Sequence, residues 1–337
     1  MAEDRGDVDH ASTTASAWAA FPPIGLATDR GCVNGGAHDD GGTTMAKEEK
    51  GAMAPRSWGL PPEALATRPT NYRPDLFAGQ RFVISGGGSG MGRASAFLAL
   101  RLGAEVMICG RDRDKLARAA DDARRLIGRA PHIHALTIRD PDAVAAFADQ
   151  AFAAMGGVDH LVNSAGGQFP LNALDLSPNG WRAVIDTNLN GTFWMMQAFA
   201  RRWVAAGEPG NVVSITMVTD RGVPQQSHGC ASRAGIVHLS KSLAVEWAPH
   251  RIRVNCIAPG TIETEGMNQY PETVLARLGK GNPMRRMGDT WQIAEAVAYL
   301  CSPSADFITG EFLHVDGGMQ LFGTHWPLGK PEWFAEL

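Results

Sequence analysis

The chain has 337 residues and a formal net charge of −4, so its overall charge gives no reason to expect a polyanion partner such as nucleic acid. Its five cysteines stand far apart and form no CxxC pair, which argues against a disulfide framework or a metal site and favours a reducing, cytoplasmic setting. No apolar run reaches the ~20 residues of a membrane span, so no membrane partner is expected.

The first part of the chain, residues 1–57, is rich in Gly, Ala, Asp, Ser and Thr and shows no apolar period. Such a composition cannot bury enough apolar surface to fold alone, so we expect a disordered extension. It lacks the basic segment and apolar core of a secretory signal, and Met45 and Met53 are plausible alternative starts. Residues 58–76 are proline-rich and predict a surface arm, and residues 323–337 form a C-terminal tail.

Residues 77–322 alternate short apolar strands with amphipathic helices. The alternation predicts an α/β fold, a Rossmann-type doubly wound parallel sheet of about seven strands with helices on both faces, as a single domain. Ligands of such sheets bind at the carboxyl ends of the strands. The predicted strands are residues 81–84, 104–109, 132–138, 160–163, 211–215, 252–257 and 312–315, and the predicted helices are residues 93–102, 114–126, 141–155, 178–206, 231–247 and 290–300.

A glycine-rich turn, Ser85-Gly-Gly-Gly-Ser-Gly-Met-Gly92, joins the first strand to the first helix. Gly86 permits a tight turn with positive φ, while Gly90 and Gly92 let a pyrophosphate approach the backbone and let the helix pack on the strand. The helix N-terminus offers free N–H groups and a positive dipole end to phosphates. This context predicts a dinucleotide site that includes Ser89 and Met91; the alternative is a connecting loop without a ligand.

Further motifs follow in order, namely Asn163-Ser-Ala-Gly166, Asp186-Thr-Asn188, Arg253-Val-Asn-Cys-Ile-Ala-Pro-Gly260 and Asp316-Gly-Gly318. In this order and at this spacing, the chain resembles the short-chain dehydrogenase/reductase family over residues 82–318. It is most similar to the 2,4-dienoyl-CoA and trans-2-enoyl-CoA reductase branch. A second likeness, to bacterial citronellol/citronellal dehydrogenases, is carried by residues 166–170, 243–247 and 326–334.

The resemblance implies a nicotinamide cofactor. An acidic residue after the second strand takes the ribose 2′-OH of NAD, whereas an arginine accommodates the 2′-phosphate of NADP. Arg111 stands there, which favours NADP over NAD; the alternative is a solvated charge at the start of a helix. Thr137 replaces the family's usual Asp after the third strand, a departure at the adenine contact. The remaining cofactor contacts implied by the resemblance are Asn163, Ala165, Gly166, Pro259, Gly260, Ile262 and Thr264.

The catalytic region departs from the family's pattern of Ser, Tyr and, four residues later, Lys. Alignment of this helix puts Arg233 at the Lys position and Gly229 at the Tyr position, and Lys241 falls eight residues too late, on the outer face. The Ser position falls on Thr216 or Met217, and we favour Thr216 because it has a hydroxyl.

Three further residues, two near the vacant Tyr position and one in the predicted helix at residues 178–206, are candidates for chemistry. Arg233 can hold the nicotinamide ribose and stabilise an anion, but it cannot act as a general base because its pKa exceeds 12. His228 is the nearby group that titrates around neutrality, and it is either a catalytic base or a structural histidine at a helix start. In the family, an Asn at the position of Asn188 bends the helix and holds a water in a proton relay.

Residues 263–289 follow the sixth strand beside the expected site and predict a substrate lid. Lys280, Arg285 and Arg286 would supply a basic patch for the phosphates of CoA. The apolar side chains of the lid either line an apolar substrate or simply dock the lid; they are Met267, Tyr270, Leu275, Leu278, Met284 and Met287.

Together these features predict an NADP-dependent oxidoreductase of lipid or isoprenoid metabolism. The missing Tyr, which the dienoyl-CoA branch also lacks, favours reduction of a conjugated C=C in an enoyl- or dienoyl-CoA thioester. The second likeness favours a dehydrogenase of an apolar isoprenoid alcohol or aldehyde, and the lost Tyr and Lys also allow a catalytically impaired nucleotide-binding subunit. We expect a homodimer or homotetramer paired through the helices that begin at Ser177 and Ala231, with Leu239 and Trp247 facing outward.

Overall fold

The structure is a computed structural model that describes residues 58–269, residue 275 and residues 278–321. The described elements belong to one compact unit. The expected extension at residues 1–57, the tail at residues 323–337 and Tyr270 lie outside the described residues. No helix in the described part of the chain is long and apolar enough to cross a membrane.

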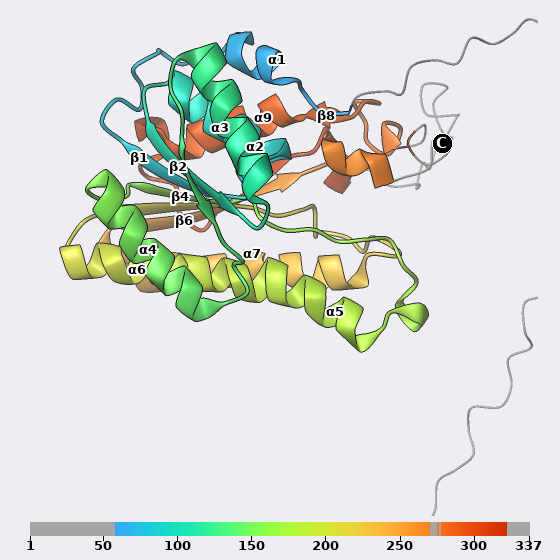
Figure 1. Ribbon diagram of the computed structural model, residues 1–337. Coiled ribbons are helices and arrows are strands. Elements are labelled where there is room, and N and C mark those ends of the chain that lie inside the picture. The colour runs from blue at the N-terminus through green and yellow to red at the C-terminus, as the bar shows by residue number, and fades with distance from the viewer. Residues whose placement is uncertain (1–57, 270–274, 276–277, 322–337) are drawn as a thin grey trace, which may run out of the picture. The chain divides into compact units, whose positions relative to one another are not determined.

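Seven parallel strands form the central sheet, in the order β3-β2-β1-β4-β5-β6-β9 (Figure 1). The strand order reverses between β1 and β4, which is the point where dinucleotides bind in doubly wound sheets. The predicted fold class is therefore confirmed. The strands are β1 (Arg81–Ser85), β2 (Glu105–Gly110), β3 (His132–Ala135), β4 (His160–Asn163), β5 (Gly210–Ile215), β6 (Ile252–Pro259) and β9 (Phe312–Val315).

Helices cover both faces of the sheet (Figure 1). One face carries α2 (Gly90–Arg101), α3 (Arg113–Ile127) and α9 (Thr290–Cys301), and the other carries α4 (Pro141–Met155), α6 (Gly191–Ala206) and α7 (Ser227–Trp247). Successive side chains of a strand point to opposite faces, so Phe82 and Ile84 pack with the first set and Val83 packs with the second. Because both faces are covered, β1 is buried at Phe82–Ser85, whereas β3 at the edge of the sheet is largely exposed.

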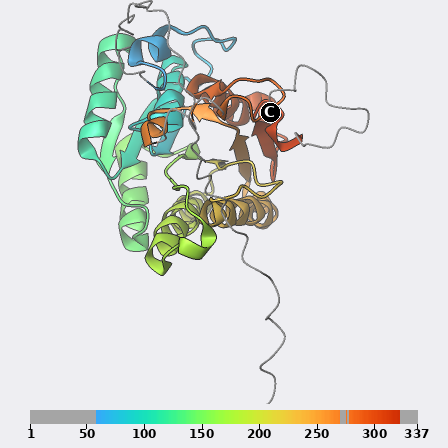
Figure 2. The same ribbon diagram turned by 90° about the vertical axis from the view of Figure 1, so that its right-hand side faces the viewer.

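The segment expected as a surface arm is attached to the domain through a short helix, α1 (Pro62–Thr67), beside α2 and α3 (Figure 2). Leu65 is fully buried in the core on that side. The Arg101 guanidinium donates to the Leu65 carbonyl at 3.1 Å, and the Tyr72 hydroxyl donates to the Glu295 carbonyl of α9 at 3.1 Å. The arm thus covers α2 and α3 and contributes to their core.

The helix predicted at residues 178–206 is divided by a π-helical turn. α5 (Pro178–Ile185) leads into the π turn at Asp186–Asn190, and α6 follows. Ser177 caps α5 by accepting from the Gly180 N–H at 3.1 Å, as the Ser-Pro start predicts. Single π turns inside α-helices are frequent at functional sites.

The apolar side chains that face outward from α7 differ from those predicted. Leu239 and Trp247 pack against the core around Leu243, so the prediction that they face outward is wrong. The helical repeat of 3.6 residues places all three on one side of α7, and the sheet buries that side. The large apolar side chain that α7 does expose is Val245, 77% exposed.

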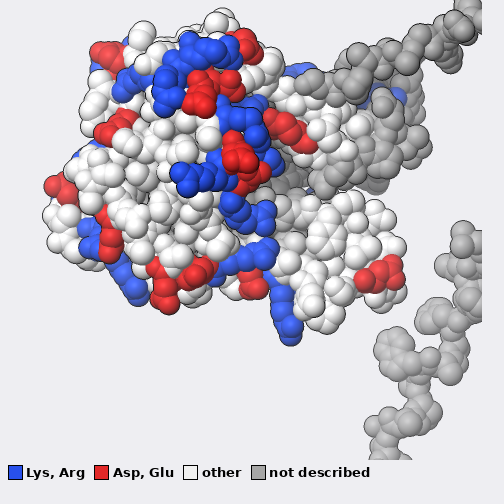
Figure 3. Space-filling model, in the orientation of Figure 1, with Lys and Arg blue, Asp and Glu red and all other residues white. Residues whose placement is uncertain are grey.

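Two very short strands, β7 (Ile262–Glu263) and β8 (Gly288–Asp289), pair in parallel at the two ends of the expected lid. On the face seen in Figure 3, Lys and Arg side chains are interspersed with Asp and Glu over α3. Arg124 and Arg125 there pair with Asp121 and Asp122, one turn earlier on the same helix. The charges of Arg124 and Arg125 are thus neutralised locally.

Candidate active site

The glycine turn lies between β1 and α2, as predicted, and the backbone conformation and packing differ from one glycine to the next. Gly86 has a φ of 71°, and a Cβ on it would lie 2.8 Å from the Ala165 nitrogen after β4. A Cβ on Gly92 would overlap the Gly86 carbonyl. Gly90 has a φ of 52°, and a Cβ on it would make only ordinary contacts, with Thr264 at 3.7 Å and Glu265 at 3.8 Å. The turn is therefore tightly packed toward the sheet at Gly86 and Gly92 and less tightly packed at Gly90.

The N-terminus of α2 is bonded by a carboxylate from a distant segment. Ser89 is the N-cap in an extended conformation, and its side chain makes no capping bond. Helix geometry leaves the first N–H groups, from Gly90 onward, without partners inside the helix. The Gly90 N–H donates to Glu265 Oε2 at 3.1 Å, a contact that sequence reasoning missed. The position of Glu265 after β7 gives no local signal for this long-range contact.

Hydrogen bonds join the segment after β4 to the end of β1 beside the turn. Ser85 Oγ accepts from the N–H groups of Ser164 and Ala165, both at 3.2 Å. Asn163 Nδ2 donates to Ser214 Oγ at 3.3 Å, while Asn163 Oδ1 is buried without a partner among the described residues. An unpaired buried acceptor is unfavourable alone, and it suits a donor from a bound ligand.

Arg111 lies directly after β2 and is exposed. Within the described residues it makes no hydrogen bond or ion pair, whereas the next residue, Asp112, caps α3 by accepting from the Lys115 N–H at 3.0 Å. Thr137, two residues beyond β3, is also exposed. The guanidinium of Arg111 is therefore available to a ligand at this edge of the sheet.

Asn188 is completely buried in the π turn and fastens the loop after β4. Its Oδ1 accepts from the Gly167 N–H at 3.0 Å, and its Nδ2 donates to the Gly167 carbonyl at 3.1 Å and to Ser232 Oγ at 3.2 Å. Ser232 Oγ in turn donates to the Gly229 carbonyl of α7 at 2.9 Å. Asn188 thus clamps the loop against α7, and its role in a water relay stays a prediction.

Arg233 is a buried cation without a carboxylate partner in the described part of the chain. Its Nη1 donates to the Ile215 carbonyl at the end of β5 at 3.1 Å, and its Nε has no partner. Burial lowers the pKa of Arg233 to about 10, so the side chain still carries its charge at neutral pH. Its Nη2 lies so close to Gly166 that a Cβ there would overlap it. A buried charge of this kind suits the oxygens of a ligand.

The vacant Tyr position is covered by a side chain that sequence reasoning did not single out. A Cβ on Gly229 would meet the Gln168 side chain at 3.2 to 3.3 Å. The Gln168 amide extends to Gln226, with Nε2 donating to Oε1 at 3.4 Å. The Gln168 side chain, which ends in a neutral amide, therefore packs directly against the position where a Tyr side chain would start. The sequence signal that could have identified Gln168 is its position in the loop directly after the Asn163 motif.

His228 is enclosed rather than open to a substrate. The residue is fully buried, and its ring packs edge-on against Phe169 with centroids 4.6 Å apart. Neither ring nitrogen has a hydrogen-bond partner among the described residues. Burial lowers the pKa of His228, with the Gln226 backbone opposing the shift, so the ring is neutral at pH 7. In this conformation His228 is positioned as a structural residue at the start of α7.

The other catalytic candidates lie where the alignment places them. Thr216 follows β5 and is buried, and its hydroxyl donates to the Ile257 carbonyl of β6 at 2.9 Å. Lys241 is exposed on α7, as predicted. Of the described tyrosines, Tyr72 contacts α9 from the arm and Tyr299 belongs to α9 itself, so neither replaces the missing Tyr.

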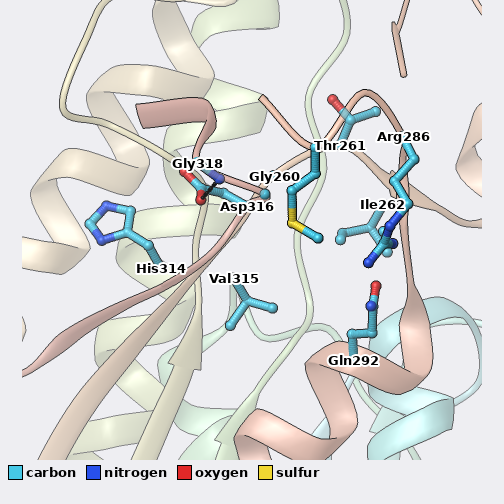
Figure 4. A pocket seen from close by; sticks show the side chains of 12 residues that line it. Gly260, Thr261, Ile262, Arg286, Gln292, His314, Val315, Asp316 and Gly318 are labelled. Atoms are coloured by element: carbon cyan, nitrogen blue, oxygen red, sulfur yellow. Dashed lines mark hydrogen bonds between the residues drawn. The ribbon is translucent and has the colours of Figure 1, made fainter. Parts of the chain in front are cut away.

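A cavity of about 530 Å³ lies at the carboxyl ends of β6 and β9 (Figure 4). It is lined by the predicted cofactor residues Gly260 and Ile262 and by Arg286 of the lid. Figure 4 shows Arg286 and Gln292 pointing toward one another across it. Arg233 and Gln168 do not line this cavity, so the predicted Arg233 lies apart from the predicted Gly260 and Ile262.

Two further predicted cofactor residues flank these groups. Pro259 ends β6, and Thr264 follows β7 near Gly90. Of the expected basic patch, Arg286 is exposed, and the lid's Leu275 is buried.

These residues fit a dinucleotide. The glycine turn begins α2, Asn163 has an unpaired oxygen, and Arg233 has a buried charge without a carboxylate partner in the described part of the chain, all at the carboxyl edge of the sheet. Phosphates, ribose hydroxyls and base edges carry the complementary groups.

Comparison with known proteins agrees with this geometry. The family model described as "Enoyl-(Acyl carrier protein) reductase" matches residues 86–320. The chain is 36% identical over 244 residues to a probable 2,4-dienoyl-CoA reductase of Bacillus subtilis, covering 71% of this chain and 96% of the relative. It is 35% identical over 254 residues to the peroxisomal 2,4-dienoyl-CoA reductase of Pongo abelii, covering 74% and 87%.

A solved structure with the same fold is the citronellol catabolism dehydrogenase of Pseudomonas aeruginosa. It superposes with a TM-score of 0.67 at 33% identity, covering 74% of this chain and 99% of that one. The family match spans the glycine turn, the strand ends and α7. The chain therefore belongs to the short-chain dehydrogenase/reductase family and is a nicotinamide-dependent oxidoreductase.

Proposed function

We propose that this enzyme uses NADPH to reduce the conjugated C=C bond of an enoyl- or dienoyl-CoA thioester. One observation carries the proposal, namely that the neutral amide of Gln168 covers Gly229, the position that most of the family gives to Tyr. An amide N–H donates a hydrogen bond to an oxygen that gains negative charge, but it does not exchange a proton at neutral pH. Reduction of a conjugated C=C needs such a donor, whereas alcohol oxidation needs a proton acceptor.

The residues of the chain would act on the thioester oxygen. When bound, NADPH supplies the hydride, which adds to a double-bond carbon conjugated with the carbonyl. The C=C electron pair shifts toward the thioester oxygen, where the Gln168 amide donates and the charge of Arg233 stabilises the anion in a buried setting. A proton from solvent then completes the product at carbon. The relatives named as 2,4-dienoyl-CoA reductases support this substrate class.

Asn188 would act by holding this donor in place. It fixes both backbone polar groups of Gly167, the residue before Gln168. The same side chain reaches Ser232 on α7, so the Gln168 loop and the helix that carries Arg233 keep one relative position. Positioning a donor before the reaction avoids reorganisation when the charge develops.

The substrate proposal is tested by a screen of NADPH oxidation with dienoyl-CoA, enoyl-CoA and citronellal, and by the reverse assay with citronellol. We expect turnover with a CoA thioester. Gln168→Ala should lower kcat by roughly 10²- to 10³-fold, as for loss of an oxyanion donor. Gln226→Ala, which alters the amide partner of Gln168 and leaves Gln168 itself in place, is the matched control and should retain most of the rate. Equal effects of both changes would contradict the proposed role.

Oxidation of an isoprenoid alcohol is the second candidate, supported by the 33% identity with the citronellol dehydrogenase. This reaction needs a base, and His228 would have to be uncovered from Phe169 to serve. His228→Ala separates the two reactions. A C=C reductase should keep most of its rate, whereas a dehydrogenase using His228 should lose roughly 10²- to 10⁴-fold and show a flattened pH profile. Cofactor binding without turnover of any tested substrate would instead indicate an impaired subunit.

Selection of NADP is proposed to depend on Arg111. Its exposed guanidinium lies directly after β2, where a 2′-phosphate is accommodated in this fold. A charge-assisted contact to phosphate contributes ~1.5–3 kcal/mol, so Arg111→Ala should weaken NADPH binding by roughly 10- to 150-fold. NADH binding should change little. Fluorescence titration with both cofactors checks this, and equal losses for NADH and NADPH would show that Arg111 only shapes the turn.

A further inference from the structure

Three segments that are distant in sequence meet at the N-terminus of α2. Glu265, which starts the 3₁₀ turn at Glu265–Gln269, accepts from the Gly90 N–H at 3.1 Å through Oε2. Its Oε1 lies 2.6 Å from Arg93 Nη2, one turn into α2. The same Nη2 donates to the Leu60 carbonyl of the arm at 3.1 Å. The Glu265 carboxylate therefore links the arm, the glycine turn and the segment after β7.

This carboxylate occupies one of the N–H groups that an anion at the N-terminus of α2 would use. The first N–H groups of α2 lack partners in the helix, and the positive end of the helix dipole favours negative charge there. In dinucleotide-binding folds, this is where the pyrophosphate binds. Glu265 already occupies the Gly90 N–H, and its own charge would repel a phosphate brought to the same place. Its side chain is 37% exposed, so it has room to leave.

Arg93 is suited to remain behind as a cation for the phosphates. Its side chain is 17% exposed, and its Nε is buried without a partner in the described part of the chain. If the Glu265 carboxylate leaves, the Arg93 guanidinium loses its acidic partner beside the helix N-terminus. A phosphate oxygen would then replace the carboxylate oxygen with the same charge-assisted hydrogen bond.

We infer that Glu265 is an internal competitor of the cofactor pyrophosphate. It stabilises the cofactor-free enzyme by binding the N-terminus of α2, and it lowers the affinity for both NADH and NADPH because it must be displaced. The inference rests on the cofactor part of the proposed function and not on the substrate. The inference gives Glu265 a role in setting the cofactor affinity, and Glu265 is not among the predicted cofactor contacts.

The test is a fluorescence titration of Glu265→Gln with NADH and with NADPH, without substrate. The glutamine keeps the shape and can still accept from Gly90, but it lacks the charge. Anion contacts at helix N-termini contribute ~0.3–2 kcal/mol, so Kd should fall by roughly 2- to 30-fold for both cofactors. The cofactor-free variant should melt at the same or a lower temperature, and the rise in Tm on adding NADPH should be larger than in the unaltered enzyme.

Glu63→Gln is the matched control, because it removes one negative charge from α1, away from the glycine turn. It should leave Kd unchanged. Adding Arg93→Met to Glu265→Gln should reverse the gain in affinity. An unchanged or higher Kd in Glu265→Gln would overturn the inference and leave Glu265 as a support for the segment after β7. Arg111→Ala should weaken the binding of NADPH alone, whereas Glu265→Gln should strengthen the binding of both cofactors. The two proposals can therefore be refuted independently.

Discussion

Arg233 is proposed to bind the cofactor because of its buried, unbalanced charge. Its charge is buried, and its Nη1 reaches only a backbone carbonyl, that of Ile215. Within the described residues no carboxylate offsets that charge, which is unfavourable in the cofactor-free enzyme and favourable once ribose or substrate oxygens are present. We therefore expect Arg233 to contribute to the free energy of cofactor binding rather than to folding stability.

The corresponding prediction compares Arg233→Ala with Arg233→Lys. The alanine variant should lose both cofactor affinity and kcat, because the cation leaves the site. The lysine variant should recover part of the affinity, since the charge returns, though a point donor cannot reproduce the planar guanidinium. Equilibrium titration and steady-state kinetics measure the two effects. Intact binding and turnover in Arg233→Ala would show that the alignment of α7 is wrong.

Between α5 and α6, the π turn serves the active site by placing Asn188 between the loop after β4 and α7. The Asn188 side chain makes three hydrogen bonds, and all three are to groups in those two segments. A continuous α-helix would rotate the following residues by part of a turn, and the contact to Gly167 would be lost. The turn therefore connects a local irregularity of the helix to the position of Gln168.

Asn188→Ala should destabilise the enzyme and slow it. The change removes the hydrogen bonds of the buried Asn188 side chain to the exposed Gly167 backbone and to the buried Ser232 hydroxyl, at a cost of about 1–3 kcal/mol in the free energy of unfolding. Urea unfolding measures this cost, and kcat should fall as the Gln168 loop loosens. Asn190→Ala is the control in the same turn, because Asn190 bonds only to the Asp186 side chain, at 2.9 Å. Similar losses in both variants would argue against a special role for Asn188.

For the molecule as a whole, a buried histidine at the amino end of the sheet makes stability depend on pH. His160, in β4, has Nε2 2.6 Å from Gln80 Oε1, and Nδ1 accepts from Asn211 Nδ2 at 3.1 Å. This bonding assigns the proton of the neutral ring to Nε2. Burial lowers the pKa of His160 to about 3, although Asp159 opposes the shift. The folded enzyme therefore keeps this ring neutral in mild acid.

The sign of this pH dependence follows from the protonation of His160 in the folded and the unfolded chain. Below the unfolded pKa of about 6.5 the unfolded chain binds a proton that the folded chain does not, so the free energy of unfolding should fall as pH decreases toward 3. The slope attributable to His160 is at most ~1.4 kcal/mol per pH unit. Urea unfolding at several pH values measures it, with His160→Gln as the variant that lacks it. Parallel pH profiles for the two proteins would contradict the assignment.

Local patterns in the sequence were sufficient for the fold. Strand and helix periods, the Ser177-Pro178 helix start and the glycine turn are properties of residues near one another in the chain, and they predicted the α/β alternation and the edge where ligands bind. The placement of Arg233 in α7 followed in the same way, because it rests on spacing within one helix. Such features are readable because their causes are short-range.

Other features were decided only by tertiary structure, because their partners are remote in sequence. Gln168 covers Gly229 from the loop after β4, and Leu65 of the arm enters the core beside α2. The outward side of α7 depended on which side the sheet buried, which is why Val245 rather than Trp247 is exposed. Glu265 reaches Gly90 across 175 residues of sequence, and no local pattern specifies such a contact, because its geometry exists only once the strands have assembled.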